Sequence, residues 1–81
     1  MAALAKTEQE IQDRLTRFLK AELKRANVTY AELAARLSKH GLKGETEASV
    51  KNKLARGTFA ASFLLASLAA LELDCLNLGD V

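Results

Sequence analysis

The sequence contains no proline, so the ring clash and missing amide that interrupt helices occur nowhere along its 81 residues. Its longest apolar run, residues 58–71, holds 14 uncharged residues. A membrane-spanning helix needs roughly 20 such residues. The single cysteine, Cys75, excludes a disulfide within one chain and provides no metal-ligand spacing. These absences, with no signal peptide apparent at the N-terminus, predict a soluble cytoplasmic protein.

Aromatic residues are also scarce, with three phenylalanines, one tyrosine and no tryptophan. Apolar residues nevertheless make up 49% of the chain, so a core must consist mainly of leucine and alanine. A chain of this length forms one domain, residues 1–81, near the lower size limit for independent folding. Together with only four glycines, this composition favours an all-α fold.

Charge is distributed unevenly, although the net charge is only +2. Residues 36–56 hold six basic and two acidic side chains, a net charge of +4. Residues 57–81 hold three acidic side chains and no basic one, and residues 1–35 have a net charge of +1. The positive excess therefore falls on the middle of the chain.

Capping patterns divide the chain into four predicted helices. Thr7 and Thr29 each precede a glutamate by three residues, as in a capping box, and Thr46 is a further candidate N-cap. Gly41 and Gly57 are suited to the left-handed conformation that ends a helix. The predicted helices span about 7–26, 30–40, 46–56 and 60–72, and the tail 73–81 is expected to be a short arm or strand.

The third predicted helix combines an apolar face with a basic one. Val50 and Leu54 are expected to point toward the core, and Lys51 lies beside this apolar face. The opposite arc contains Ala48, Ser49, Asn52, Lys53 and Arg56, without an acidic residue. Asparagine, serine and lysine can read base edges in the major groove of DNA. A basic helix face is more often simply solvated, so this arc alone does not establish nucleic-acid binding.

The segments TYAELAARL and ASVKNKLARGTFAASFLLASLAALEL resemble λ-repressor-like helix-turn-helix domains of the Cro/CI or Xre type. The matching elements are Leu33-Ala34, Arg56-Gly57 and the Leu/Ala-rich helix 64–71. The stretch LKAELKRANVTYAELAARL also resembles a small bacterial family known only as a domain of unknown function. The turn SKHGLKGETE is longer than the tight turn usual in helix-turn-helix domains.

This resemblance implies a compact four- to five-helix bundle that binds duplex DNA sequence-specifically, as a small bacterial transcriptional regulator. The expected base-contacting residues are Ser49, Asn52 and Lys53. The expected phosphate-contacting residues are Thr29, Tyr30, Lys39, Lys43, Lys51 and Arg56. The fourth helix is apolar nearly all round, which predicts a homodimer. Its expected interface residues are Phe63, Leu65, Leu68 and Leu76.

An enzyme is not expected, because His40 and Cys75 lie in separate segments and no phosphate-binding glycine-rich loop is present. No cofactor, metal or small-molecule substrate is predicted. The main alternative is a protein-interaction module that presents its apolar fourth helix to a protein partner. RNA binding is a weaker third possibility, because the sequence shows no set of exposed aromatic side chains for base stacking.

Overall fold

The computed structural model describes residues 3–81, and every regular element in this range is a helix. The α-helices are α1 (Glu8–Ala26), α2 (Tyr30–Lys39), α3 (Glu47–Arg56) and α4 (Ala61–Ala70). A one-turn 3-10 helix, η1 (Leu78–Asp80), lies in the tail. The predicted all-α fold with four helices is confirmed over residues 3–81, where the tail forms no strand.

Threonine side chains begin the first three helices. The Oγ1 atoms of Thr7, Thr29 and Thr46 accept hydrogen bonds from the backbone N–H three residues further on, at 3.2, 3.1 and 3.1 Å. At α3 the box is reciprocal, because the Thr46 N–H donates to Ser49 Oγ at 2.8 Å. Such an N-cap typically stabilises a helix by about 1 kcal/mol.

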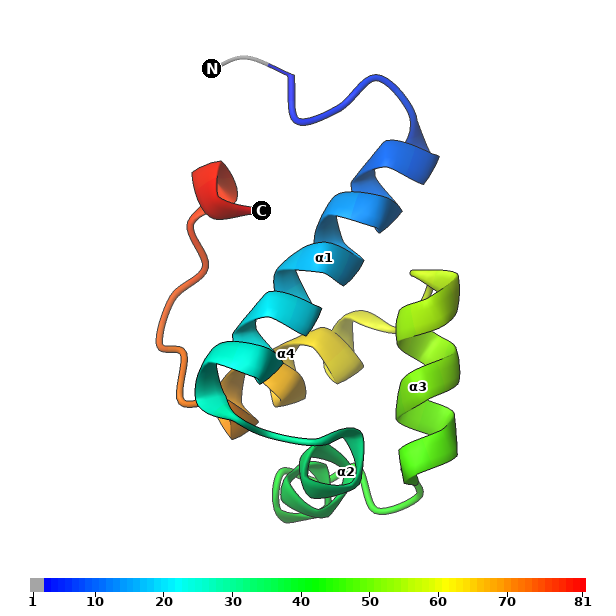
Figure 1. The fold of residues 1–81 in the computed structure, drawn as a ribbon, viewed down its shortest axis with the longest axis vertical. Coiled ribbons are helices and arrows are strands. Elements are labelled where there is room, and N and C mark those ends of the chain that lie inside the picture. The colour runs from blue at the N-terminus through cyan, green and yellow to red at the C-terminus, as the bar shows by residue number, and fades with distance from the viewer. Residues whose placement is uncertain (1–2) are drawn as a thin grey trace.

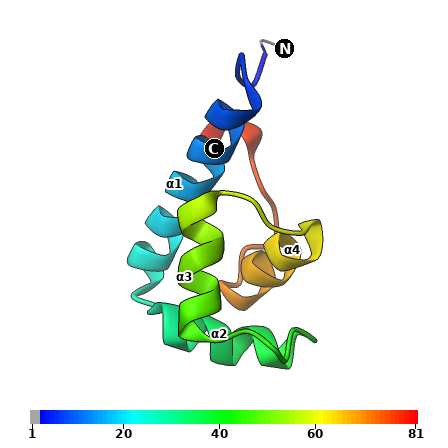
Figure 2. The same cartoon turned by 90° about the vertical axis from the view of Figure 1, so that its right-hand side faces the viewer.

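The helices pack so that α3 contacts both α1 and α2, while α4 also contacts α2. In Figure 1, α1 runs down the centre with α3 to its right, α2 below them seen end-on and α4 behind. Figure 2 turns α3 toward the viewer, between α1 and α4 and above α2. One long side of α3 is therefore left at the surface of the molecule.

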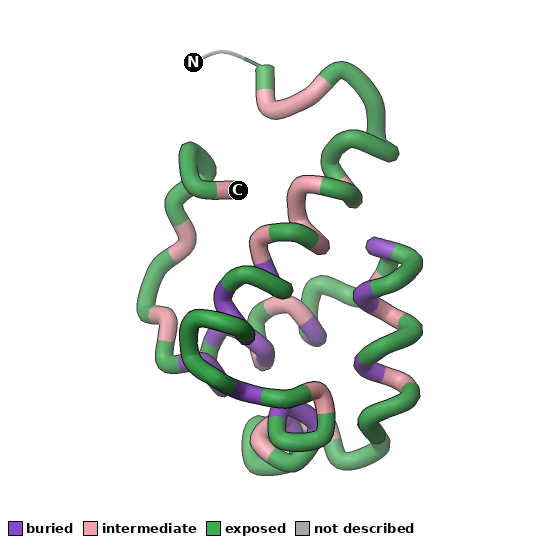
Figure 3. Tube along the Cα trace, in the orientation of Figure 1, coloured by how far each residue is buried: buried purple, intermediate pink, exposed green. Residues whose placement is uncertain are grey.

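Figure 3 shows buried positions on all four helices. The core side chains at these positions are mainly aliphatic, together with one aromatic ring. The core residues that are at most 4% exposed are Leu19, Leu23, Leu33, Leu37, Val50, Leu54 and Phe63. Val50 and Leu54 are fully buried, as their predicted inward position requires. This core fixes the rotation of α3 about its own axis, and hence the side chains that it presents to solvent.

Gly57 sets the distance between the end of α3 and α1. It is buried and has a left-handed φ of +71°, and its N–H donates to the Lys53 carbonyl. A Cβ atom at this position would lie 3.0 Å from Gln12 Cβ and 3.2 Å from Thr16 Oγ1 on α1. A residue without a side chain is thus needed here both for the turn and for the contact.

After α4 the tail returns toward α1, and it is seen on the left in Figure 1. Arg14 Nε donates a hydrogen bond to the main-chain oxygen of Val81 at 2.9 Å, and the same guanidinium bonds the Leu4 carbonyl. In residues 3–81, no helix combines the length and the apolar character needed to cross a membrane. The apolar α4 has only ten residues.

Candidate nucleic-acid interface

The exposed side of α3 carries two cations and an amide between small side chains. Its exposed residues, apart from Glu47 in the first turn, are Ala48, Lys51, Asn52, Ala55 and Arg56. No carboxylate follows Glu47 on this helix, and Glu47 lies at the N-terminal end, where a negative charge suits the helix dipole. The centre of the exposed face therefore bears positive charge beside the hydrogen-bonding amide of Asn52.

Ser49 and Lys53 lie on the flank of this face, where they contact other parts of the protein. Both are half-buried. Ser49 Oγ donates to the Glu45 carboxylate at 2.7 Å, and Lys53 Nζ pairs with the same carboxylate. Lys53 Nζ also lies 5.1 Å from the centre of the Phe63 ring, within the range of a cation–π contact.

The rotation predicted for α3 therefore needs a correction. Asn52 points directly away from the core, and Ser49 and Ala55 lie at equal angles from it on opposite sides of the helix. Lys53 and Lys51 form a second such pair, further round toward the core. Sequence reasoning placed the Ser49 and Lys53 flank outward and Lys51 beside the core. In the structure Glu45 and Phe63 cover the first flank, and Lys51 is exposed.

Glu45 is held in its charged form by these two partners. Burial raises the pKa of the Glu45 carboxyl, but hydrogen bonds from Lys53 and Ser49 and the charge of Lys53 outweigh it, so the pKa lies below its ordinary value. At neutral pH the Glu45 carboxylate therefore neutralises one of the three cations of α3. It also links the turn between α2 and α3 to the side chains of Ser49 and Lys53 on α3.

Helix α1 contributes a second row of cations that sequence reasoning missed. Arg17, Lys20 and Lys24 are exposed and lie on one face of α1, at the spacing i, i+3, i+7. Arg17 and Lys20 line a shallow depression together with Arg56 and Gly57 at the end of α3. The spacing was visible in the sequence, but the packing of that face beside α3 was not.

The start of α2 adjoins the other end of this row. Lys20, Lys24, Thr29, Tyr30 and Glu47 line one depression where α1, α2 and α3 meet. Thr29 is exposed, whereas Tyr30 is half-buried and packs against the core. The structure thus brings the predicted phosphate contacts Thr29 and Tyr30 next to the two lysines of α1.

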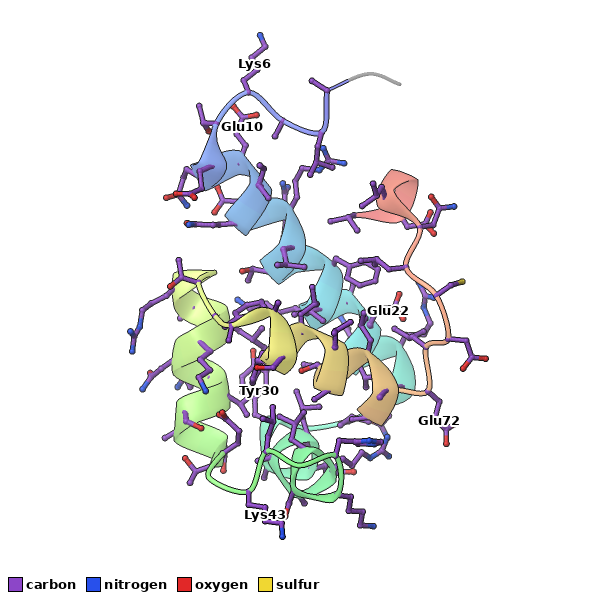
Figure 4. The ribbon with its side chains drawn as sticks, turned by 180° about the vertical axis from the view of Figure 1, so that it is seen from behind. Lys6, Glu10, Glu22, Tyr30, Lys43 and Glu72 are labelled. Carbon is purple, nitrogen blue, oxygen red and sulfur yellow. The ribbon has the colours of Figure 1, made fainter. Side chains whose placement is uncertain are left out.

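Lys39 and Lys43 are exposed as well, but they lie at the opposite end of α2 from this junction. Figure 4 shows Lys43 projecting from the lower end of the molecule, outside the helices. The turn that carries it is anchored by a hydrogen bond from the Leu42 N–H to the Leu37 carbonyl at 3.0 Å. Lys39 and Lys43 are therefore exposed cations in the last turn of α2 and in the turn that follows it.

The residues predicted for a dimer interface are divided between core and surface. Phe63 and Leu68 are 2% and 7% exposed in the single chain, so neither is available to a second chain. Leu65 is 67% exposed, and Leu76 is half-buried. Within residues 3–81, no three side chains of histidine, cysteine, aspartate or glutamate gather at a spacing that could hold a metal ion.

The fold and the surface together define a small all-helical domain in which exposed cations of α1 adjoin the end of α3. Residues 11–76 match the domain of unknown function DUF6471, and the chain belongs to this family. The match covers all four α-helices except the first turn of α1. No curated protein and no solved structure matches the chain.

Proposed function

We propose that this protein binds duplex DNA through α3, in the manner of a λ-repressor-like helix-turn-helix domain. The observation that carries the proposal is the exposed face of α3, where Lys51, Asn52 and Arg56 stand between small side chains. The major groove is wide enough to admit an α-helix, and the small exposed side chains of Ala48 and Ala55 permit close approach.

The side chains of this surface divide into two chemical roles. Asn52, at the centre of the exposed face, is suited to a bidentate contact with adenine, and Lys51 or Arg56 to a contact with guanine. Arg17, Lys20 and Lys24 on α1 would contact phosphates on one side of the groove, and such contacts supply affinity without sequence information. Ser49 and Lys53 would have to leave Glu45 before they could reach a base.

Such a domain would act as a small bacterial transcriptional regulator. One domain makes a limited contact with DNA, so high specificity calls for a second domain on a half-site about one helical turn away. The homodimer predicted from the sequence provides this second domain. Of its predicted contact residues, Leu65 and Leu76 are those that retain accessible surface in the single chain.

The proposal is tested by fluorescence anisotropy of a labelled mixed-sequence duplex at about 50 and 200 mM salt. For three to five neutralised phosphates, affinity should fall roughly 40- to 500-fold over this range. Lys51→Ala/Arg56→Ala and Lys20→Ala/Lys24→Ala should each weaken binding at low salt. A matched control, Lys6→Gln/Arg25→Gln, removes two cations from outside this surface and should bind nearly as the wild type does.

Two results would count against DNA binding at this surface. One is the absence of salt-dependent binding at about 50 mM, and the other is equal loss of affinity in the control and in the α3 variant. Equal loss would mean that the protein is held by its overall charge rather than by the face of α3. The protein-interaction alternative then gains weight, and the surface that favours it lies on α4.

A further inference from the structure

A groove with an apolar floor lies between α4 and the tail. The tail and α3 lie on opposite sides of α1 (Figure 1). We call this groove the α4–tail groove. Its apolar lining consists of Leu64, Leu65, Leu68, Ala69, Leu73, Cys75 and Leu76. Leu65 is the most exposed large apolar side chain in residues 3–81, at 67%. Burying that leucine would be favourable for any partner of matching shape.

The charges that line this groove are all negative. Glu72 and Asp74 are exposed and are its charged lining residues. The last turns of α1, α2 and α3 each carry two basic side chains, which compensate the negative end of the helix dipole. The last turn of α4 carries none, and Glu72 follows it within two residues. Arg36 reaches the Ala70 carbonyl from the side of α2, without lining the groove.

Glu72 has an unusual backbone conformation for a residue with a side chain. Glu72 has a φ of +60°, in the left-handed region that favours glycine, and its N–H donates to the Ala69 carbonyl. The chain therefore places a carboxylate at a helix end where glycine would be the easier residue. Figure 4 shows the Glu72 side chain pointing outward into solvent, away from the helices.

We propose that the α4–tail groove binds an amphipathic helix of a protein partner, with leucine-like side chains on one face and lysine or arginine beside them. The apolar face would cover Leu65 and Leu76, and the cations would meet Glu72 and Asp74. This inference is independent of DNA binding, because it concerns a different surface.

A second copy of this chain fits the groove less well than a basic helix does. Two copies related by a two-fold axis through the groove would bring the carboxylates of Glu72 and Asp74 from both copies into one interface, where the groove lining offers no cation to pair with them. Like charges brought together in this way are unfavourable. In this proposal Leu65 and Leu76 contact a basic helix, so a homodimer on DNA would need a contact outside the α4–tail groove.

The experiment uses two designed helical peptides of equal length with the same leucine stripe. One carries lysines beside the stripe and the other carries glutamates in the same places. Binding to the full chain is measured by anisotropy, and the site is mapped by amide chemical-shift changes in the isotope-labelled protein. We expect the basic peptide to bind more tightly, and its shifts to fall on Leu65 and residues 72–76.

Variants separate this site from a general attraction between opposite charges. Glu72→Gln/Asp74→Asn should weaken the basic peptide about threefold to tenfold, as expected for two partly exposed ion pairs. The control Glu8→Gln/Glu47→Gln removes two carboxylates from outside the groove and should have little effect. Leu65→Ser should weaken both peptides, and circular dichroism would verify that each variant keeps its helices.

The proposal is overturned if both peptides bind equally, or if the control variant loses as much affinity as the groove variant. It is also overturned if sedimentation shows a dimer that Leu65→Ser dissociates, because the groove then holds a second copy. A DNA titration followed by the same amide shifts should affect α3 and α1 instead. Failure of one proposal is thereby distinguished from failure of the other.

Discussion

Replacing Gly57 with alanine tests the contact that holds α3 against α1. Two separate costs are expected from the added methyl group. The first is the left-handed backbone, since Gly57 has a φ of +71°. The second is contact, because the new Cβ would lie 3.0 Å from Gln12 Cβ and 3.3 Å from the Gln12 carbonyl oxygen. Neither neighbour is the end of a flexible side chain, so α3 or α1 has to shift.

The magnitude follows from the two costs. A left-handed alanine costs about 1–2 kcal/mol, and overpacking of a tight contact costs typically about 1–3 kcal/mol. Gly57→Ala should therefore destabilise the protein by roughly 2–5 kcal/mol, a large part of the stability of a domain of this size. Gly41→Ala isolates the first cost, because Gly41 has a φ of +96° but no atom within 4 Å of the added Cβ.

Urea denaturation followed by circular dichroism at 222 nm measures these differences. Gly44→Ala serves as a baseline, because that position has neither positive φ nor a near neighbour. The expected order of stability is Gly44→Ala, then Gly41→Ala, then Gly57→Ala. Equal destabilisation at Gly57 and Gly41 would refute the reasoning, since it would show that α1 and the end of α3 are not in close contact.

Two other perturbations address the core and the turn. Ser67 is fully buried on α4, and its Oγ has no hydrogen-bond partner within residues 3–81, so Ser67→Ala should stabilise the protein by about 1 kcal/mol. A thermal melt should show a rise of several degrees, whereas exposed Ser62→Ala should change the midpoint little. Glu45 has a lowered pKa in the folded protein, so its contribution is present above its unfolded pKa and is lost as pH falls through the folded value. Glu45→Gln should thus lower the free energy of unfolding by about 1 kcal/mol at pH 7 and by less near pH 3. Urea denaturation midpoints of the wild type and the variant at the two pH values measure this. A destabilisation that is the same at both pH values would contradict the assignment.

Local chemistry made the helices predictable from the sequence. Thr29 and Thr46 each cap the helix they were expected to begin, and Gly57 ends α3 in the left-handed conformation. These signals act within four residues, so they do not depend on the rest of the fold. The inward pair on α3 was predictable for a similar reason, because Val50 and Leu54 are the large apolar side chains of that helix.

Which segments cover each face of a helix could not be predicted from such local signals. The two flanks of α3 are alike in sequence, and Glu45 and Phe63 decide which of them is covered. The apolar α4 was expected to need a second chain. Within the single chain, Leu73 and Leu76 of the returning tail pack against the core beside that helix. Leu65 is the large side chain of α4 that this tail leaves open.

Basic and acidic residues are concentrated in different parts of the sequence, and the fold places these parts on different sides of the molecule. Residues 36–56 carry most of the net positive charge and residues 57–81 carry only negative charge, and Gly57 lies at the boundary between them. Figure 1 shows α3 on one side of α1 and the acidic tail on the other. The resulting field would turn α3 toward a polyanion and the α4–tail groove away from it before contact is made. The two proposed surfaces share no residue, so a polyanion and a basic helix would not compete for the same side chains.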